Sequence, residues 1–261
     1  MNDKYEVKGR VRKLEQRKDW NLGLGHLPNR DSFDVEFWPS GQILRLTTYN
    51  MAGAVIGSEQ LDYSDSGKRT CSLEFDSAGQ QTHTKCFVHE TEGNRVITVS
   101  QTDGKFTGRT VEVYDGSLLL SFASYDANNL LKREKTFQYN GNQLQTSDSR
   151  LYIPDATLVE QWLSSYDPEG RIAETYGLTG DAKPLGDGKY KYEYDPEGRT
   201  SRVWTFNDVA PDGPASGLKI HEYKTDKAGN WIERRAFYQS HGDSTWSVKT
   251  TTRKLTYFPL G

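Results

Sequence analysis

The sequence predicts an all-β fold, a tandem antiparallel β-hairpin meander of roughly 16–18 strands with little or no helix. Three observations carry this prediction: a turn motif ending in glycine that recurs at short intervals, alternation of residue types between the turns, and an unusual composition. Aromatic residues make up 12% of the 261 residues and hydrophobic residues only 34%. Tyr, Phe and Trp must therefore supply much of the buried area.

The turn motif is a glycine that follows a short polar stretch and, before it, an aromatic or aliphatic residue. It recurs every 11 to 14 residues from Gly41 to Gly141, with Asn at one position, and then every 28 to 31 residues up to Gly229. A step of about 12 residues equals one strand and one tight turn. The doubled step predicts that one end of the sheet keeps tight turns while the other end has longer loops after about residue 150.

The clearest copies of the motif read Tyr-Asp-Pro-Glu-Gly-Arg, at residues 166–171 and 194–199. Asp accepts backbone hydrogen bonds at the start of such a turn, Pro presets φ, and Gly supplies a positive φ. A type I turn followed by a left-handed Gly closes a hairpin with a bulge. We therefore assign turn-forming roles to Asp167, Gly170, Asp195, Gly198 and Gly229.

The segments between the turns alternate with the period of a strand. Tyr190, Tyr192 and Tyr194 point to one face, and the Lys and Glu residues between them point to the other. After the turn, Trp204 and Phe206 share one face. A sheet with an aromatic and a charged face must hide the aromatic one. The sheet is therefore expected to form a large coiled sheet, an open barrel or a sandwich.

The chain is predicted to be a single all-β repeat domain, residues 1–261. Within it we expect an irregular N-terminal cap at 1–36, tight-turn repeats at 37–150 and longer-loop repeats at 151–261. The net charge is −3 with both signs interspersed, which argues against nucleic acid as a partner. No apolar run approaches the roughly 20 residues of a membrane span. Without a signal segment the chain is expected in the cytoplasm, or in the periplasm or outside the cell if a leader has been removed.

The two cysteines, Cys71 and Cys86, flank the turn at 76–79 almost symmetrically. They should lie opposite or diagonal to each other on adjacent strands. A cross-strand disulfide and two reduced thiols both remain open, and the lack of an export signal favours the thiols.

The period, the "YDPEGR" turns and the stretch "YKTDKAGNWIERRAFY" at 223–238 resemble the YD-repeat, or Rhs-repeat, family. The match is close at 166–171 and 194–199, a variant at 223–238, and looser over 37–141. In that family the hairpins form a wall that spirals into a hollow shell around toxin or adhesive cargo, and most repeats carry no catalytic residue. The resemblance implies a non-catalytic bacterial protein-interaction or scaffold module, either a shell fragment of a toxin system or an immunity partner.

The acidic pairs in the two turns are poor candidates for catalysis. Asp167 with Glu169, and Asp195 with Glu197, lie two residues apart within one exposed turn, whereas a glycosidase needs acids that face each other across a cleft. No nucleophile elbow, zinc-protease, phosphate-loop or dinucleotide motif occurs. We therefore expect no enzyme, and a hydrolase with acids from distant strands is the least favoured alternative.

No metal site or cofactor is expected. His83 and His89 would share one face of a strand about 20 Å apart, too far for one metal ion, and Cys86 would point the other way.

Two loops, 179–188 and 207–217, are longer than a turn requires and are the best places for a binding surface. With the tryptophan next to the last turn, they supply the candidate binding residues Trp231, Asp181, Lys183, Asp187, Asp208 and Asp212. The expected partner is a protein or a glycan. A carbohydrate-binding module that uses exposed Trp and Tyr is the alternative function.

Overall fold

The structure, a computed structural model, describes residues 11–21, 32–50, 52–153, 157–206, 215–240 and 246–258, with only the backbone at 17–21, 186–187 and 240. These ranges contain eighteen β-strands and no helix, which confirms the predicted all-β fold. The strands are β1 (Val11–Asn21), β2 (Ser32–Phe37), β3 (Ile43–Tyr49), β4 (Val55–Tyr63), β5 (Arg69–Phe75), β6 (Gln81–Glu92), β7 (Arg95–Thr102), β8 (Lys105–Asp115), β9 (Leu118–Asp126), β10 (Leu131–Asn140), β11 (Gln143–Tyr152), β12 (Leu158–Tyr166), β13 (Ile172–Thr179), β14 (Pro184–Tyr194), β15 (Thr200–Phe206), β16 (Gly217–Thr225), β17 (Trp231–Ser240) and β18 (Ser247–Tyr257).

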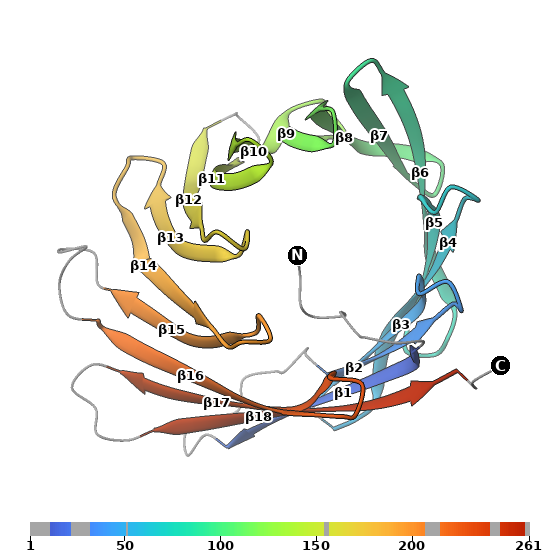
Figure 1. Ribbon diagram of the computed structural model, residues 1–261. Coiled ribbons are helices and arrows are strands. Elements are labelled where there is room, and N and C mark those ends of the chain that lie inside the picture. Colours follow the sequence, from blue (N-terminus) through green and yellow to red (C-terminus); the bar gives the residue numbers. More distant parts are fainter. Residues whose placement is uncertain are drawn as a thin grey trace.

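The strands form one closed barrel. Each strand pairs antiparallel with the next one along the chain, and β1 pairs with β18 to complete the ring (Figure 1). The sequence left a coiled sheet, an open barrel and a sandwich open as alternatives. The structure is a closed barrel, in which none of the described strands has an unpaired edge.

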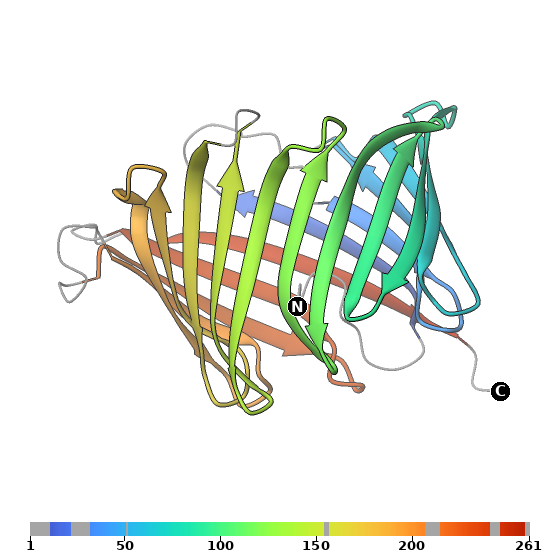
Figure 2. The same ribbon diagram turned by 90° about the horizontal axis from the view of Figure 1, so that it is seen from above.

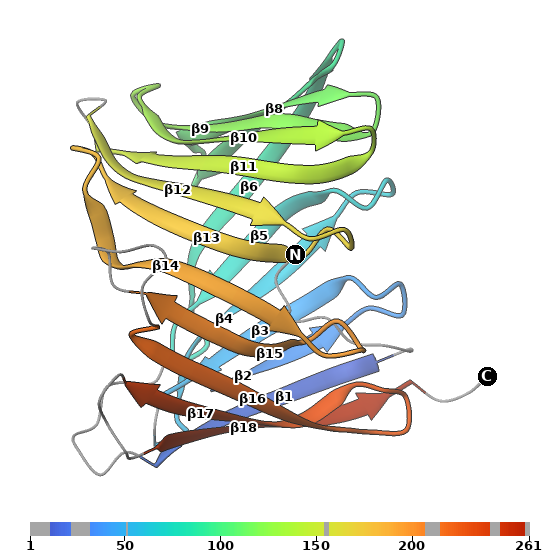
Figure 3. The same cartoon turned by 60° about the vertical axis from the view of Figure 1, so that its left-hand side comes forward.

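The connections alternate between two rims of the barrel, and the strands run obliquely from one rim to the other (Figures 2 and 3). The first rim holds the turns that follow the even-numbered strands. Eight glycines with φ between 57° and 87° lie there: Gly41, Gly67, Gly93, Gly116, Gly141, Gly170, Gly198 and Gly229. The second rim holds the connections that follow the odd-numbered strands. Those after β5, β7, β9 and β13 are short turns, and those after β1, β3, β11, β15 and β17 lie partly or wholly outside the described residues.

Two segments differ from the expectation. Within the predicted cap at 1–36, residues 11–21 form β1 and residues 32–36 belong to β2. The motif at Gly41 marks only the end of β2, and no glycine motif marks where β1 begins or ends. The expected loop at 179–188 is a short turn, since β14 already begins at Pro184. Proline is tolerated as the first residue of a strand, where its missing N–H breaks no ladder.

The two faces of the sheet form an inner and an outer wall. On β18, Lys249, Thr251 and Arg253 are buried, whereas the alternate residues Thr252 and Lys254 are exposed. Paired residues share a face, so the buried face continues through Ala236 on the neighbouring strand. The concave side of a closed barrel offers less area per residue, and the buried face is therefore the inner wall.

The best-packed part of the inner wall lies at the seam where the ring closes. Its core contains Val11, Leu14, Phe33, Val35 and Phe37, each at most 7% exposed. Ile43, Leu46 and Leu255 pack against it. These residues come from both ends of the chain, so the seam joins β1, β2, β3 and β18.

Candidate functional site

The tyrosines of β14 line the inner wall. Tyr190, Tyr192 and Tyr194 are partly buried, and the alternate residues Lys191 and Glu193 are exposed. The ring of Trp162 lies 6.3 Å from that of Tyr190, and it covers Gly177, where an added Cβ would come within 2.8 Å of the indole. Glycine is needed at this position because the ring occupies the place of a side chain.

Trp204 and Phe206 lie on the outer wall of the barrel. A bulge next to the 194–199 turn shifts the register, so that Trp204 pairs with Lys191 and Phe206 with Lys189. The Lys189 amine lies 5.8 Å from the Phe206 ring. The outer wall here is therefore mixed rather than purely charged, and a lysine lies beside the aromatic ring of Phe206.

In both Tyr-Asp-Pro-Glu-Gly-Arg turns the carboxylates bind the arginine of the same turn. Asp195 accepts bonds from the Arg199 backbone N–H at 2.8 Å and from its Nε at 2.6 Å, and Glu197 accepts from Nη2 at 2.9 Å. The first turn repeats the pattern with Asp167, Glu169 and Arg171. Both acids of each pair therefore have a structural role, because each binds the arginine of its own turn.

Each turn is also tied to the tyrosine that begins the next one. Arg171 lies 4.5 Å above the Tyr194 ring, and the Tyr194 hydroxyl donates to the Ile172 carbonyl at 2.8 Å. Arg199 and Tyr223 repeat the stacking at 4.8 Å. Burial alone would raise the pKa of Asp167, but the hydrogen bonds from Arg171 outweigh it and hold that pKa below its usual value.

Asp195→Ala is expected to lower the free energy of unfolding by about 1–2 kcal/mol, because it removes the acceptor of two hydrogen bonds in a tight turn. Urea unfolding followed by near-UV circular dichroism measures this loss. Glu197→Ala is the matched control. Its carboxylate side chain is 56% exposed, so a change below about 0.5 kcal/mol is expected, and equal losses in the two variants would contradict the assigned role of Asp195.

The third turn leads into a cluster of aromatic and cationic side chains on the inner wall. Asp226 accepts bonds from Ala228 and Asn230, and Trp231 follows at once. The Arg253 guanidinium lies 3.4 Å from the Trp231 ring centroid, the Arg234 guanidinium 5.5 Å away on β17. The Tyr223 ring meets the same indole edge-on at 6.2 Å. Trp231 thus has two guanidinium groups within cation–π distance of its ring, an arrangement that stabilises the cluster.

His221 lies beside this cluster and is 9% exposed. Its ring stacks against Tyr223 with centroids 6.1 Å apart. Burial, followed by the charges of Lys219 and Arg234, lowers the pKa of His221 to about 3. The imidazole is therefore neutral at physiological pH.

Of the other predicted binding residues, Asp181 and Lys183 do not join this cluster. Asp181 and Lys183 lie in the short turn at the second rim and pair with each other at 2.6 Å. The bond from Lys183, with one from Thr179, lowers the pKa of Asp181 to about 2. The side chain of Asp187, and all of Asp208 and Asp212, lie outside the described residues.

The two histidines next to the cysteines have separate partners. His83 pairs with Asp103 at 2.8 Å, which raises the pKa of His83. His89 bonds to Thr98 at 2.9 Å and to the Arg69 carbonyl at 2.8 Å. In the part of the chain that the structure describes, no three His, Cys, Asp or Glu side chains are grouped to hold a metal ion.

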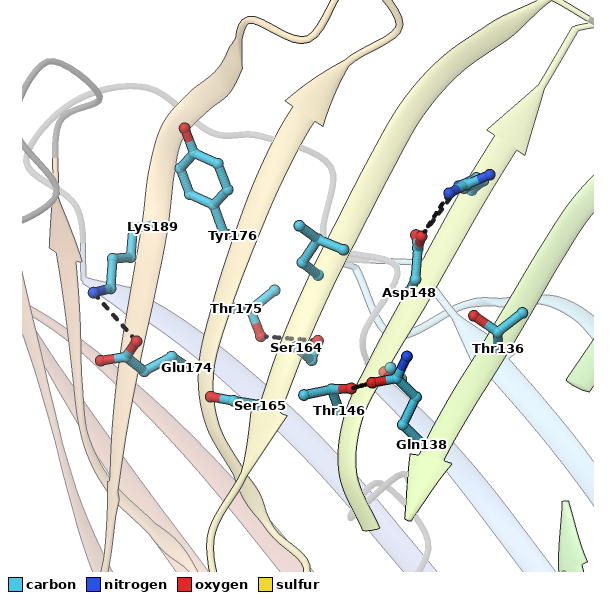
Figure 4. Close-up of a pocket in the computed structure, with 13 residues that line it drawn as sticks. Thr136, Gln138, Thr146, Asp148, Ser164, Ser165, Glu174, Thr175, Tyr176 and Lys189 are labelled. Carbon is cyan, nitrogen blue, oxygen red and sulfur yellow. Dashed lines mark hydrogen bonds and ion pairs between the residues drawn. The ribbon is translucent and has the colours of Figure 1, made fainter. Parts of the chain in front are cut away.

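The outer wall has a hollow of about 620 Å³ across β10–β14, seen from outside in Figure 4 with the opposite wall behind it. Its charged side chains are paired with each other. Asp148 bonds to Arg150 at 2.9 Å, and Glu174 to Lys189 at 3.2 Å. The remaining lining is mainly Ser, Thr and Gln, with Leu163 39% exposed.

Among the tryptophans whose side chains are described, the exposed ones do not form a row. Trp38, at 44% exposure, lies at the first rim and Trp246, at 41%, at the second. A sugar-binding platform needs neighbouring aromatic rings, so this placement does not favour the carbohydrate alternative.

No helix with the length and hydropathy of a membrane-crossing segment occurs in the described ranges.

Sequence reasoning singled out Trp231 but missed His221, Arg234 and Arg253. The alternation of β16 places His221 on the same face as Tyr223, which was a usable signal. No sequence signal could have predicted that Arg253 of β18 contacts Trp231, because no local pattern indicates which strand closes a barrel.

No protein-family model matches the chain, and no curated protein matches it. Solved structures that match the chain include a porin-like protein from Bacteroides uniformis, with 9% identity and a TM-score of 0.47, and the match covers 96% of this chain and 99% of that one. A porin-like protein from Bacteroides vulgatus has 12% identity and a TM-score of 0.40, with 96% and 99% covered. The Tc holotoxin pore of Photorhabdus luminescens has 11% identity and a TM-score of 0.22, with 93% of this chain and 18% of that one covered. At such low identities and TM-scores these likenesses carry nothing about function.

Proposed function

We propose that this chain is a non-catalytic interaction module, a closed barrel that holds a segment of a protein partner against its inner wall. The observation that carries the proposal is the cluster around Trp231, in which two guanidinium groups and the Tyr223 ring surround one indole. Trp, Tyr and Arg side chains dominate the binding energy of protein interfaces. Tyr190, Tyr192 and Tyr194 extend this kind of surface along the same wall.

Two features of the fold support a wall rather than a sheet edge as the binding surface. Every described strand is paired on both sides, so a partner cannot bind by adding a strand. The outer wall carries ion pairs in mid-strand, such as Glu174 with Lys189, where the lipid-facing wall of a membrane barrel carries apolar side chains. The proposal therefore places the barrel in water.

The finer proposal follows the resemblance to YD repeats: a bacterial scaffold of a toxin system, either a shell fragment or an immunity partner. Its support is the chain of Arg–Tyr links between consecutive turns, which gives the repeated residues a role in wall building. A disulfide joins Cys71 and Cys86, and this supports an oxidising location such as the periplasm or the cell exterior.

Photo-crosslinking tests the proposed binding wall. Benzoylphenylalanine in place of Tyr192, on the inner wall, is expected to crosslink a protein partner in cells, and the same residue in place of Lys191, on the outer wall, is not. Adding Trp231→Ala to the Tyr192 variant should lower the crosslinked yield by roughly fivefold or more. Circular dichroism verifies that each variant keeps its fold.

Crosslinks from position 191 alone would place the partner outside the barrel. Equal yields with and without Trp231 would remove the cluster from the interface. For the finer proposal, this chain is co-expressed with the product of a neighbouring toxin gene. An immunity partner should restore the growth of the cells, and unchanged toxicity would rule out the immunity role.

A further inference from the structure

Two nitrogen atoms on the inner wall are buried and have no hydrogen-bond partner: Nδ1 of His221 on β16 and Nε of Arg234 on β17. Buried polar atoms in folded proteins are nearly always paired. His221 is also 9% exposed, so water reaches the ring only at its margin. Two such atoms on neighbouring strands call for a ligand that satisfies both.

The ladder between β16 and β17 brings the two side chains together. His221 lies opposite Ala236, and Tyr223 lies opposite Arg234. His221 and Arg234 are therefore diagonal neighbours on one face, with Cβ atoms about 7 Å apart. Ala236, the residue opposite His221, has a small side chain, so no long side chain stands between the two nitrogen-bearing groups on this face.

The surroundings favour a negative charge. Lys219 lies two residues before His221 on the same wall, with its amine 4.9 Å from the Tyr238 ring. Among the described residues, the inner wall of β15–β18 presents no Asp or Glu side chain. A wall on which the described charged side chains are cationic raises the local concentration of anions.

We propose that His221 and Arg234 form a binding site for an anionic oxygen group, a carboxylate or a phosphate, on the inner wall of the barrel. The guanidinium of Arg234 donates from Nε and a terminal nitrogen, a fork that matches two oxygen atoms of one anion. His221 takes a proton from solvent as the anion binds and donates it from Nδ1, because the anion supplies the negative charge that stabilises an imidazolium. The Trp231 ring lies 5.5 Å from the Arg234 guanidinium, on the same wall.

This site goes beyond the proposed function, because a free small anion can fill it without any protein partner. A failure to find a partner by crosslinking would leave anion binding measurable. Absence of anion binding would equally leave the crosslinking result intact.

Isothermal titration of the full chain with inorganic phosphate, and separately with acetate, tests the site. At least one anion is expected to bind with one-to-one stoichiometry, and Arg234→Met should weaken that binding by roughly tenfold or more. Arg235→Met is the matched control, since Arg235 is the next residue, faces outward and bonds to Glu233 at 2.9 Å. The anion affinity of the Arg235→Met variant should stay within about twofold of that of the unmodified chain.

Proton uptake provides a second readout that a structural role of Arg234 would not change. By NMR titration, the pKa of His221 should rise from about 3 when the anion is saturating. His221→Gln should abolish the uptake, seen as a loss of the buffer dependence of the binding heat. Binding of phosphate alone assigns a phosphate site, and binding of acetate alone assigns a carboxylate site. The proposal is overturned if neither anion binds, if Arg234→Met binds as the unmodified chain does, or if the pKa of His221 does not move.

Discussion

Leu14→Ala is expected to lower the free energy of unfolding by about 3 kcal/mol, within the range for a fully buried leucine in a packed core. Leu14 is 0% exposed. It lies opposite Leu255 of β18 and Val35 of β2, so it sits in the middle of the closing seam. Truncation leaves a cavity where two strands from the two ends of the chain meet.

The seam is the place where this loss should be localised. Every other strand pairing joins neighbours along the chain, whereas β1 and β18 must find each other across the whole sequence. Hydrogen exchange of the β1 and β18 amides should therefore increase first in Leu14→Ala. Urea unfolding gives the total loss.

Lys254→Ala is the control for the seam, because Lys254 precedes Leu255 but its side chain is 78% exposed on the outer wall. Its loss should remain below about 0.5 kcal/mol. If Leu14→Ala lost no more than this control, the buried cluster would not be what holds the barrel closed.

Replacing both cysteines, Cys71→Ser with Cys86→Ser, is expected to cost about 3 kcal/mol of unfolding free energy. The disulfide joins directly opposite residues of β5 and β6, with a sequence separation of 15. Its loss restores conformational freedom to the unfolded chain, and urea unfolding of the oxidised protein and the double variant compares the two. The sequence left both a disulfide and two free thiols open and favoured the thiols, whereas the structure shows the disulfide.

Reductant supplies the internal control. The unmodified protein in excess dithiothreitol should unfold at the same urea concentration as the double variant, and the double variant should not respond to reductant. An unmodified protein that is indifferent to reductant would instead contain two free thiols.

The hairpins themselves could be predicted because their determinants are local. Gly170, Gly198 and Gly229 have φ values of 77°, 80° and 81°, which follow from tight turns that require the left-handed region. The spacing of such glycines predicted the number of strands. The outward position of Trp204 could not be predicted, because a bulge beside the turn changes which residues pair.

The candidate site was predictable only in part. Trp231 follows a recognisable turn, so its place near the first rim could be inferred. The two predicted residues Asp181 and Lys183 instead pair with each other in a short turn. The cationic partners of Trp231 come from β17 and β18, and their approach depends on strand register rather than on a motif.

By itself, the sequence determined that this chain is a meander of hairpins, where its clearest turns lie, and which residues alternate along each strand. Turns and alternation depend on contacts within a few positions, and these are written in adjacent residues. Only the tertiary structure decided that the meander closes, which face is the inner wall, and that His221, Arg234 and Trp231 meet there. Closure requires contacts such as the bond from Arg253 to Gln16, 237 residues apart in the chain, and no local pattern specifies a contact over that distance.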